Sequence, residues 1–527
     1  MSATLPRQHS RRTMRTDIQI PASPPAPPRR RPLVRALIVL LVLGLVAVVT
    51  LAGIVAMVWF RADVSNVGRL DFANRLQIPP LQEPRTDAGG TKVLALRLQA
   101  GTSHFLPGRT TPTWGANGAY LGPTLHASRG DKVRIDVTND LPEATTIHWH
   151  GMHLPARADG GPHQMIQPEA TWSPTWTIDQ PAATLWYHPH PHRKTEDHVS
   201  RGLSGLFLLD DPQARTLPLP KRYGVDDVPV IIQDKRFRGD GRFAGGDLGS
   251  DILVNGTYNP HLPVVSRLVR FRLLNASTAR SYNIGFADNR PFDQIASDGG
   301  LLQAPYRTTR VQLSPGERAE IVAAFQPGER VVLRSFQPDL GENFLAGRFN
   351  GASDTFDLLQ VRAASNLRAA PAVPARLANN QRDRLDPASA TRTRRIAITS
   401  SDSIDGKSMD MDRIDQVVTL GTTEIWEVRN QSGSFHNFHV HDVQFKVLQY
   451  NGAAPPPNRA GWKDTVPLPP DQSVRFVTRF TDYADPSSPY MFHCHLLRHE
   501  DNGLMGQFVV VQPGHAAAPS PAHRHHG

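Results

Sequence analysis

The sequence predicts an all-β protein in which three β-sandwich domains follow a single N-terminal transmembrane helix. The composition favours strands and turns over helices, because 46 prolines and 40 glycines accompany many Val, Leu and Thr residues. A strand that ends in asparagine occurs three times, at residues 134–139, 270–275 and 423–430. Such a repeat indicates three related domains. An uncharged apolar run at residues 36–60 predicts the helix.

The length and charge of the chain limit its class. A chain of 527 residues suits two to four domains. Its one cysteine excludes an internal disulfide framework. Residues 1–35 carry eight arginines and one acid, so they account for +7 of the net charge of +10. The remainder is nearly neutral, and we therefore expect no nucleic-acid partner despite the high pI.

The apolar run is long enough to span a bilayer. Its 25 residues would extend further than the roughly 30 Å hydrocarbon core. Arginines on its N-terminal side predict that residues 1–35 stay in the cytoplasm and that everything after Arg61 faces the periplasm or the cell exterior. The alternative is a cleaved signal peptide and a soluble periplasmic protein. Arg30 and Arg31 resemble a twin-arginine export signal, so the export route stays open.

Strand and turn patterns give the expected domain boundaries. The second domain has no paired histidines, and we expect it to act as a spacer. The boundaries are 1–35 for a cytoplasmic Arg/Pro-rich tail, 36–60 for the anchor or signal, 61–90 for a linker, 91–215 for the first domain, 226–363 for the second, 364–392 for a connector, 393–513 for the third and 514–527 for a disordered His-containing tail.

Ten of the 22 histidines lie in four short clusters, one of which contains the only cysteine. A thiolate among imidazoles is a soft site that suits copper. In an extended chain, histidines two residues apart face the same side and can bind one metal or two adjacent ones. A buried inert cysteine with incidental histidines is the simpler alternative, but four clusters in two domains argue against it. The clusters are His148-x-His150, His188-x-His190, His436-x2-His439-x-His441 and His493-Cys494-His495-x3-His499.

These motifs resemble those of the three-domain multicopper oxidases, of the bacterial laccase and cuprous-oxidase kind, over roughly residues 90–513. The resemblance implies cupredoxin-like Greek-key β-sandwiches and four copper ions, with the trinuclear cluster between the first and third domains. It also implies the ligands of each ion: His436, Cys494 and His499 for type 1; His148 and His439 for type 2; His150, His188 and His495 for one type 3 copper; and His190, His441 and His493 for the other.

The resemblance also points to residues around the metals. Asp159 and Glu500 match acids that assist oxygen reduction and relay protons, although a turn aspartate and a solvated glutamate are the simpler readings. Relatives often have an axial methionine ten residues after the cysteine, where this chain has Leu504 followed by Met505. We expect Leu504 to face the type 1 copper and to raise its potential. A shifted loop would instead present Met505.

The function implied by the resemblance is oxidation of a small donor coupled to reduction of O₂ to water. Electrons would pass one at a time from the type 1 site through Cys494 and its histidine neighbours to the trinuclear site. We favour a phenolic or similar donor, because the chain has only nine methionines and no methionine-rich segment. Met409 and Met411 could form a small metal-binding patch or could simply pack.

Three alternatives remain open. The first is a cuprous or manganous ion oxidase. The second is a copper-free envelope scaffold of the same fold, against which the complete ligand set argues. The third is a copper nitrite reductase, which lacks the His-Cys-His bridge and generally has two domains.

Overall fold

The computed structural model describes residues 31–62, 64–378 and 385–518, so most of the expected cytoplasmic tail and the end of the His-containing tail lie outside the described residues. The chain forms two compact units, which meet in sequence between Phe60 and Arg61. The first contains all but the last two residues of α1 (Arg31–Ala62), a helix long and apolar enough to cross a membrane. Its position near the N-terminus fits either an anchor or a signal sequence.

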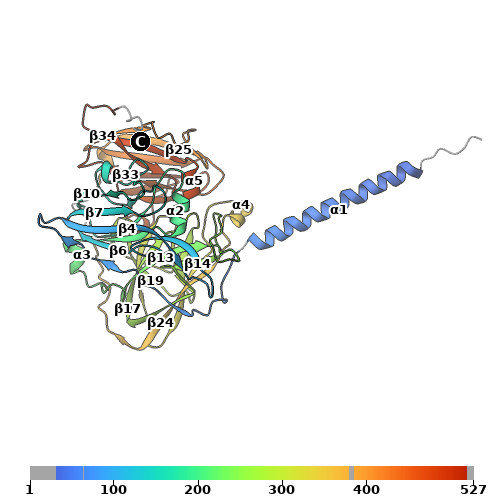
Figure 1. Cartoon of the computed structure of the whole chain (residues 1–527), viewed down its shortest axis with the longest axis horizontal. Helices are drawn as coiled ribbons and strands as arrows, with labels where there is room; N and C mark the ends of the chain where they lie inside the picture. The colour runs from blue at the N-terminus through green and yellow to red at the C-terminus, as the bar shows by residue number, and fades with distance from the viewer. Residues whose placement is uncertain (1–30, 63, 379–384, 519–527) are drawn as a thin grey trace, which may run out of the picture. The chain divides into compact units, whose positions relative to one another are not determined.

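The second unit is built from six sheets that pair into three sandwiches, which confirms the all-β, cupredoxin-like prediction (Figure 1). In the first domain, one sheet has the order β10-β7-β4-β3, with β5 on β4 and β9 on β7, and the other has the order β2-β6-β12-β11-β8. The elements are β2 (Leu81–Gln82), β3 (Arg85–Thr86), β4 (Lys92–Ser103), β5 (Thr111–Ala116), β6 (Thr124–Ser128), β7 (Lys132–Asn139), β8 (His148–His150), η1 (Ala156–Ala158), β9 (Thr171–Trp172), β10 (Thr175–Thr177), β11 (Ala183–His188), α2 (Thr195–Arg201), β12 (Gly205–Asp210) and α3 (Pro212–Thr216).

The second domain pairs a six-stranded sheet, β1-β16-β24-β23-β18-β21, with a seven-stranded one, β15-β14-β13-β17-β22-β19-β20. Its elements are β1 (Asn74–Arg75), β13 (Asp227–Lys235), β14 (Asp251–Val254), β15 (Thr257–Tyr258), β16 (Pro260–Ser266), β17 (Leu268–Asn275), β18 (Tyr282–Phe286), β19 (Phe292–Ser297), β20 (Gly300–Thr308), β21 (Val311–Leu313), β22 (Arg318–Ala324), β23 (Arg330–Phe336), α4 (Phe344–Phe349) and β24 (Phe356–Arg368).

The third domain pairs the sheets β26-β25-β28-β33-β30-β31 and β27-β35-β34-β29-β32. Its elements are η2 (Pro387–Ser389), β25 (Ala390–Ser400), β26 (Ser403–Ile404), β27 (Gln416–Thr419), β28 (Thr423–Asn430), β29 (His436–Val440), β30 (Phe445–Tyr450), η3 (Pro457–Arg459), β31 (Trp462–Lys463), β32 (Thr465–Leu468), β33 (Ser473–Arg479), β34 (Asp485–His493), α5 (Leu497–Asp501) and β35 (Met505–Val511).

Each sandwich encloses its own apolar core, because alternate residues of its strands face inward. In β7, Val133, Ile135 and Val137 are fully buried, whereas Arg134 and Asp136 between them are partly exposed. Three separate core clusters correspond to the three domains. The positions at which the domains begin and end stay predictions. The segment 61–90, expected as a linker, also contributes β1, which pairs with β16 of the second domain, and β2 and β3, which pair within the first.

The asparagine repeat marks the same corner in all three domains. Each asparagine ends a strand (β7, β17 or β28) that runs parallel to the first long strand of its domain (β4, β13 or β25). Asn139, Asn275 and Asn430 are fully buried. The amide nitrogen of each donates to two backbone carbonyls, and its amide oxygen accepts the N–H two residues on. The repeat is therefore structural, since it persists in the domain without paired histidines.

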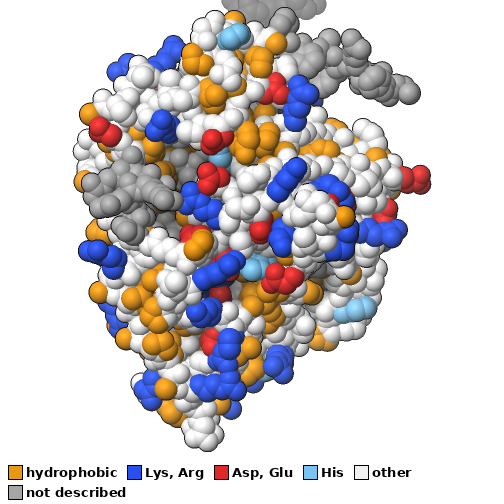
Figure 2. Space-filling view, turned by 90° about the vertical axis from the view of Figure 1, so that its left-hand side faces the viewer, with side chains coloured by type: hydrophobic (Ala, Val, Ile, Leu, Met, Phe, Trp, Pro, Cys, Tyr) orange, Lys and Arg blue, Asp and Glu red, His pale blue; other side chains and the backbone are white. Residues whose placement is uncertain are grey.

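Figure 2 shows basic, acidic and apolar side chains interspersed over the face that it draws, with Lys and Arg most frequent toward its lower end. This distribution suits a body whose net charge is small beside its number of charged groups. The expected absence of a nucleic-acid partner stays a prediction.

Candidate metal centre

The first domain brings four of the expected ligands together through the pairing of β8 with β11. His148 and His150 alternate with Trp149, whose side chain is buried in the core, so both histidines face the other way. His148 pairs with His188, and His150 pairs with Trp186 of the neighbouring strand. His190 follows two residues later, and its backbone N–H donates to the hydroxyl of Thr146. All four imidazoles are at most 1% exposed.

The third domain supplies the other seven through β29, β34 and α5. His439 of β29 pairs with His493 of β34, and His441 follows β29 directly. Beyond β34 the chain turns, and the N–H of Cys494 donates to the carbonyl of Leu504. The amide oxygen of Asn437 accepts the N–H of His495 at 2.7 Å. These contacts fix the His-Cys-His segment between β29, which contains Asn437, and the start of β35, which follows Leu504.

His436, Cys494 and His499 form one compact set. The Sγ of Cys494 lies 3.4 Å from Nδ1 of His436 and 3.8 Å from Nδ1 of His499, and the two Nδ1 atoms are 3.2 Å apart. The hydroxyl of Ser432 lies 2.8 Å from the other ring nitrogen of His436. This contact fixes the ring so that Nδ1 faces the sulfur. A thiolate with two imidazoles is the donor set of a blue copper site.

Two further triads match the expected type 3 sets. In one, Nε2 of His188 is 3.4 Å from both Nδ1 of His150 and Nε2 of His495. In the other, Nε2 of His493 is 3.2 Å from the Nε2 atoms of His190 and His441. Two nitrogens bound to one ion at about 2.0–2.1 Å and tetrahedral angles would be about 3.3 Å apart. The triads therefore have the spacing that a shared transition metal requires.

The two expected type 2 ligands have free nitrogens. The Nε2 atoms of His148 and His439 are buried and have no hydrogen-bond partner, whereas their Nδ1 atoms contact the backbone carbonyls of Asp159 and Asp464. A buried nitrogen without a partner is costly unless it binds something. The donor set thus fits copper, and the unsatisfied atoms are those that a metal would use.

Burial favours the neutral form of several of these imidazoles. It lowers the pKa of His190 to about 4 and that of both His436 and His495 to about 3. Neutral imidazole is the form that binds metals. Burial also raises the pKa of the Cys494 thiol to about 12. The thiolate is therefore unfavourable unless a cation is bound beside it, because metal coordination deprotonates a thiol.

Asp159 and Glu500 both lie against the expected ligands. An oxygen of Asp159 is 2.8 Å from Nδ1 of His441, and its other oxygen is 3.4 Å from Nδ1 of His148. The carboxylate of Glu500 lies between His190 and His493, 3.4 and 3.1 Å from their Nδ1 atoms. Both acids are 1% exposed. Carboxylates on the far nitrogens of ligand histidines orient the rings, and here they could also supply protons.

Sequence reasoning missed a third carboxylate, that of Asp464. Its Oδ1 is 3.1 Å from Nε2 of His150, and the Thr465 hydroxyl is 3.2 Å from the same nitrogen. Asp464 precedes β32 in a stretch without histidines, so no local sequence pattern predicts that its side chain belongs to the site. Only the pairing of β32 with β29 brings it to the site.

The side chains of Leu504 and Met505 lie in different surroundings. Leu504 is fully buried in the same apolar cluster as Cys494 and Leu496. Met505 begins β35 and lines a different pocket, together with Ile404 and Gly506. This arrangement supports Leu504 as the axial neighbour, which stays a prediction.

The contacts around Met409 and Met411 do not indicate a metal site. Met409 and Met411 are both half-buried. The backbone carbonyls of Asp410 and Met411 accept hydrogen bonds from the Gln507 amide, which fixes this segment against β35.

Comparisons with known proteins agree with this arrangement. Two family models, each described as multicopper oxidase, match residues 97–214 and 377–514. The multicopper oxidase mco of Staphylococcus haemolyticus is 36% identical over 450 residues, which cover 83% of this chain and 93% of that protein. The cell division protein FtsP of Escherichia coli is 35% identical over 444 residues, 82% of this chain and 92% of the relative.

A solved structure shares the fold. It is that of a bacterial laccase-like multi-copper oxidase, CueO, from a lignin-degrading Ochrobactrum species, and it superposes with a TM-score of 0.75 at 35% identity. The match covers 83% of this chain and all of the solved one. From the fold, the histidine and cysteine clusters and these similarities, the chain belongs to the multicopper oxidase family, whose members are oxidoreductases that use O₂ as the electron acceptor.

Proposed function

We propose that the protein oxidises a phenolic or similar small donor at a type 1 copper and reduces O₂ to water at a trinuclear copper cluster. The proposal assigns each set of ligands as the resemblance implied, with His148 and His439 on the type 2 ion. When bound, the four copper ions would supply one-electron redox chemistry and O₂ reduction. The observation that carries the proposal is the convergence of eleven buried or half-buried ligands into sets with metal-like spacing.

The chain itself connects the two kinds of site. Cys494 belongs to the type 1 set, and its peptide neighbours His493 and His495 belong to the two type 3 sets. A single peptide bond therefore joins the cysteine to each of those histidines. Asp159 and Glu500 lie 2.8 and 3.1 Å from the Nδ1 atoms of His441 and His493, and their carboxyl groups would pass protons to the site as oxygen is reduced.

A pocket beside His499 supports a small aromatic donor. Its volume is about 150 Å³, and an apolar cavity of about that size can hold one benzene ring. Leu340, Phe349, Phe435 and Leu496 line it, and His499 forms part of its wall. Among the described residues of this lining, none is a methionine. The Ochrobactrum relative has oxidase activity towards lignin model compounds.

The same pocket also favours a second candidate donor, a metal ion. Asp247 and Glu342 are in its lining. Carboxylates suit Mn²⁺ better than they suit Cu⁺, which prefers soft ligands. Both carboxylates have partners: Glu342 accepts the backbone N–H of Phe435 at 2.8 Å, and Asp247 lies 2.8 Å from Nε of Arg498. Asp247 is the more exposed of the two. Manganous oxidation would therefore depend on Asp247, whereas phenol oxidation would depend on the apolar wall.

A copper-free scaffold is the remaining alternative, because relatives called multicopper oxidase and relatives called cell division protein are almost equally similar to this chain. The complete set of ligands supports the oxidase. For location, we propose that α1 is retained as an anchor in the cytoplasmic membrane, with the copper domains on the periplasmic or outer side. The mass of the mature protein would show whether the N-terminal helix is retained as an anchor or removed as a signal peptide.

Oxygen uptake by the copper-loaded protein tests the choice of donor. Phenol, Cu⁺ and Mn²⁺ are supplied separately to the wild type and to Asp247→Asn. We expect phenol to support uptake in both proteins. Uptake with Mn²⁺ alone, lost in Asp247→Asn, would favour the metal-ion oxidase, and a protein that takes up neither copper nor oxygen would favour the scaffold.

A further inference from the structure

We propose that Arg318, in the second domain, is a positioning residue for the trinuclear copper site. It would act through Asp464, which holds His150 in the tautomer that leaves Nδ1 free for copper. This inference rests on the proposed function, since it assumes that copper binds to His150. The second domain would then have a part in the metal site, although it contributes none of the expected ligands and was predicted only to separate its neighbours.

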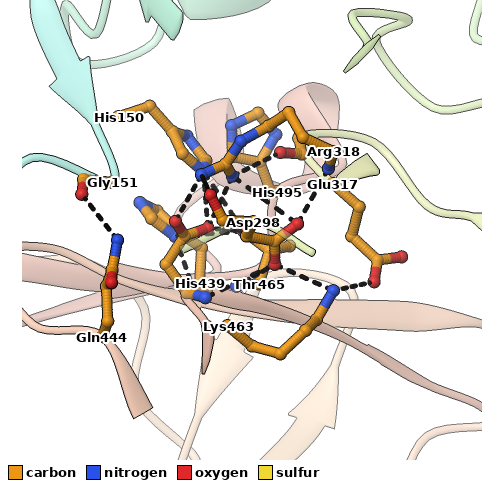
Figure 3. A network of polar contacts seen from close by, with 12 residues as sticks. His150, Gly151, Asp298, Glu317, Arg318, His439, Gln444, Lys463, Thr465 and His495 are labelled. Atoms are coloured by element: carbon orange, nitrogen blue, oxygen red, sulfur yellow. Dashed lines mark hydrogen bonds and ion pairs between the residues drawn. The ribbon is translucent and has the colours of Figure 1, made fainter. Parts of the chain in front are cut away.

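Arg318 is the first residue of β22, and its side chain is fully buried at the meeting point of the three domains (Figure 3). Its Nη1 and Nη2 donate to the two oxygens of Asp464 at 2.7 and 2.6 Å. Its Nε donates to the carbonyl of Thr184 in the first domain, and its remaining N–H groups donate to the carbonyls of Gly316 and Asp298. Every donor of the guanidinium is therefore used.

Because Arg318 fixes the carboxylate of Asp464, that carboxylate can fix the orientation and the tautomer of His150. Its Oδ1 is 3.1 Å from Nε2 of His150, and an ionised carboxylate can only accept. Nε2 must therefore carry the proton, so that Nδ1 is unprotonated and faces His188 and the expected copper. The Thr465 hydroxyl donates to the same carboxylate oxygen and contacts Nδ1 of His439, so the type 2 ligand is held by the same group.

A second ion cluster holds the Asp464 segment from the other side. The ammonium of Lys463 lies 2.8 Å from Asp298 and 2.7 Å from Glu317, and all three side chains are at most 5% exposed. The other oxygen of Asp298 accepts the backbone N–H of Arg318 at 2.8 Å. Residues 463–465 of the third domain are thus bound to the second domain at two places. Such a buried network restricts its members more strongly than one pair would.

The backbone is shaped to admit the Arg318–Asp464 pair. Gly151 directly follows His150 and has a φ of +84°, in the region that favours glycine. A Cβ at that position would lie 2.5 Å from an oxygen of Asp464 and 2.7 Å from Nη2 of Arg318. Any other residue there would displace the pair. The glycine thus leaves free the space that the ion pair occupies beside His150.

Lysine cannot replace this arginine. The guanidinium presents a planar fork that matches both oxygens of a carboxylate, whereas an ammonium is a point charge that would leave several of these buried acceptors without donors. Arg318→Lys should therefore keep the charge but lose the orientation of Asp464. Removal of comparable contacts behind metal ligands typically weakens metal binding about 10–100-fold.

The test compares four copper-loaded full-length proteins: the wild type, Arg318→Lys, Asp464→Asn and the control Arg394→Lys. Arg394 makes a matched bidentate pair with Glu424, similarly buried but within the third domain and apart from the ligands. Each protein is titrated with a copper chelator. The copper that remains is counted, the blue band reports the type 1 ion, and electron paramagnetic resonance reports the type 2 ion.

We expect Arg318→Lys and Asp464→Asn to lose trinuclear copper at about 10–100-fold lower chelator concentration than the wild type, with the blue band unchanged. Arg394→Lys should retain copper like the wild type, whatever stability it loses. If Arg318→Lys does not fold, the copper retention of the nearly isosteric Asp464→Asn protein decides the test. Copper retention and spectra equal to those of the wild type would overturn the inference. A wild type without trinuclear copper would instead overturn the proposed function.

Discussion

The imidazole rings of His150 and His439 stack across the interface between the first and third domains, with their centroids 3.7 Å apart and their planes 11° apart. A second stacked pair, His148 and His441, has centroids 3.8 Å apart. Each domain thus supplies one member of each pair, and neither domain alone holds a complete set of the expected type 2 or type 3 ligands. The docking of the two domains builds the metal site.

Glu500→Gln tests the proposed proton donor. Glutamine keeps the size of the side chain but cannot release a proton, so we expect turnover to fall about 10²-fold, most strongly at alkaline pH where solvent protons are scarce. Copper content and the blue band should be unchanged. The pH profile of oxygen uptake measures the effect.

Asp501→Asn is the matched control for that experiment. Asp501 accepts the backbone N–H groups of Thr195 and Glu196 at the start of α2, and it contacts none of the expected ligands by hydrogen bond. The Asp501→Asn substitution should cost about 1 kcal/mol of stability and leave turnover close to that of the wild type. Equal loss of turnover in both variants would contradict a specific role for Glu500.

Leu504→Met tests the axial position. A thioether donor in place of an apolar side chain should lower the reduction potential of the type 1 copper, since an added ligand stabilises the oxidised ion. Redox titration of the blue band measures the change, and Met505→Leu should leave the potential unaltered. The opposite pattern would assign the axial position to Met505.

His153 should make the stability of the domain interface depend on pH. Burial would lower its pKa, but Asp442 and Asp482, 2.7 and 3.0 Å from its two ring nitrogens, raise it to about 10. The folded pKa exceeds the unfolded value of about 6.5, so the stabilisation is complete below pH 6.5 and disappears as the pH rises through 10.

His153→Gln should therefore destabilise the protein by about 2–4 kcal/mol near pH 6 and by much less near pH 10. Denaturant unfolding at both values provides the measurement. If the loss of stability in His153→Gln were larger near pH 10 than near pH 6, it would contradict the inference that His153 is stabilised in its protonated form.

The sequence predicted which histidines would share a face, because their spacing is local. An alternating strand puts His148 and His150 on one face regardless of what lies opposite. The asparagine corner was equally visible, since Asn139, Asn275 and Asn430 bond within their own turns and to one neighbouring strand. Such features need little knowledge of the tertiary fold.

Long-range partners could not be predicted in the same way. Arg318 and Asp464 are 146 positions apart and belong to different domains. Nothing in either local sequence distinguishes them from ordinary charged residues beside a strand. The short strands in the segment 61–90 were missed for a related reason, because β1 and β2 have only two residues each and depend on β16 and β6, which lie far away in the sequence.

Copper content and colour in Cys494→Ser show whether this thiolate holds a blue copper beside a trinuclear site. The wild type should bind four copper ions per chain and be blue, since one thiolate serves the type 1 ion and eight imidazoles serve the other three. The variant should lose the blue band and one ion while it keeps three. A variant that stayed blue, or a wild type that bound no copper at the interface histidines, would contradict the proposed copper sites.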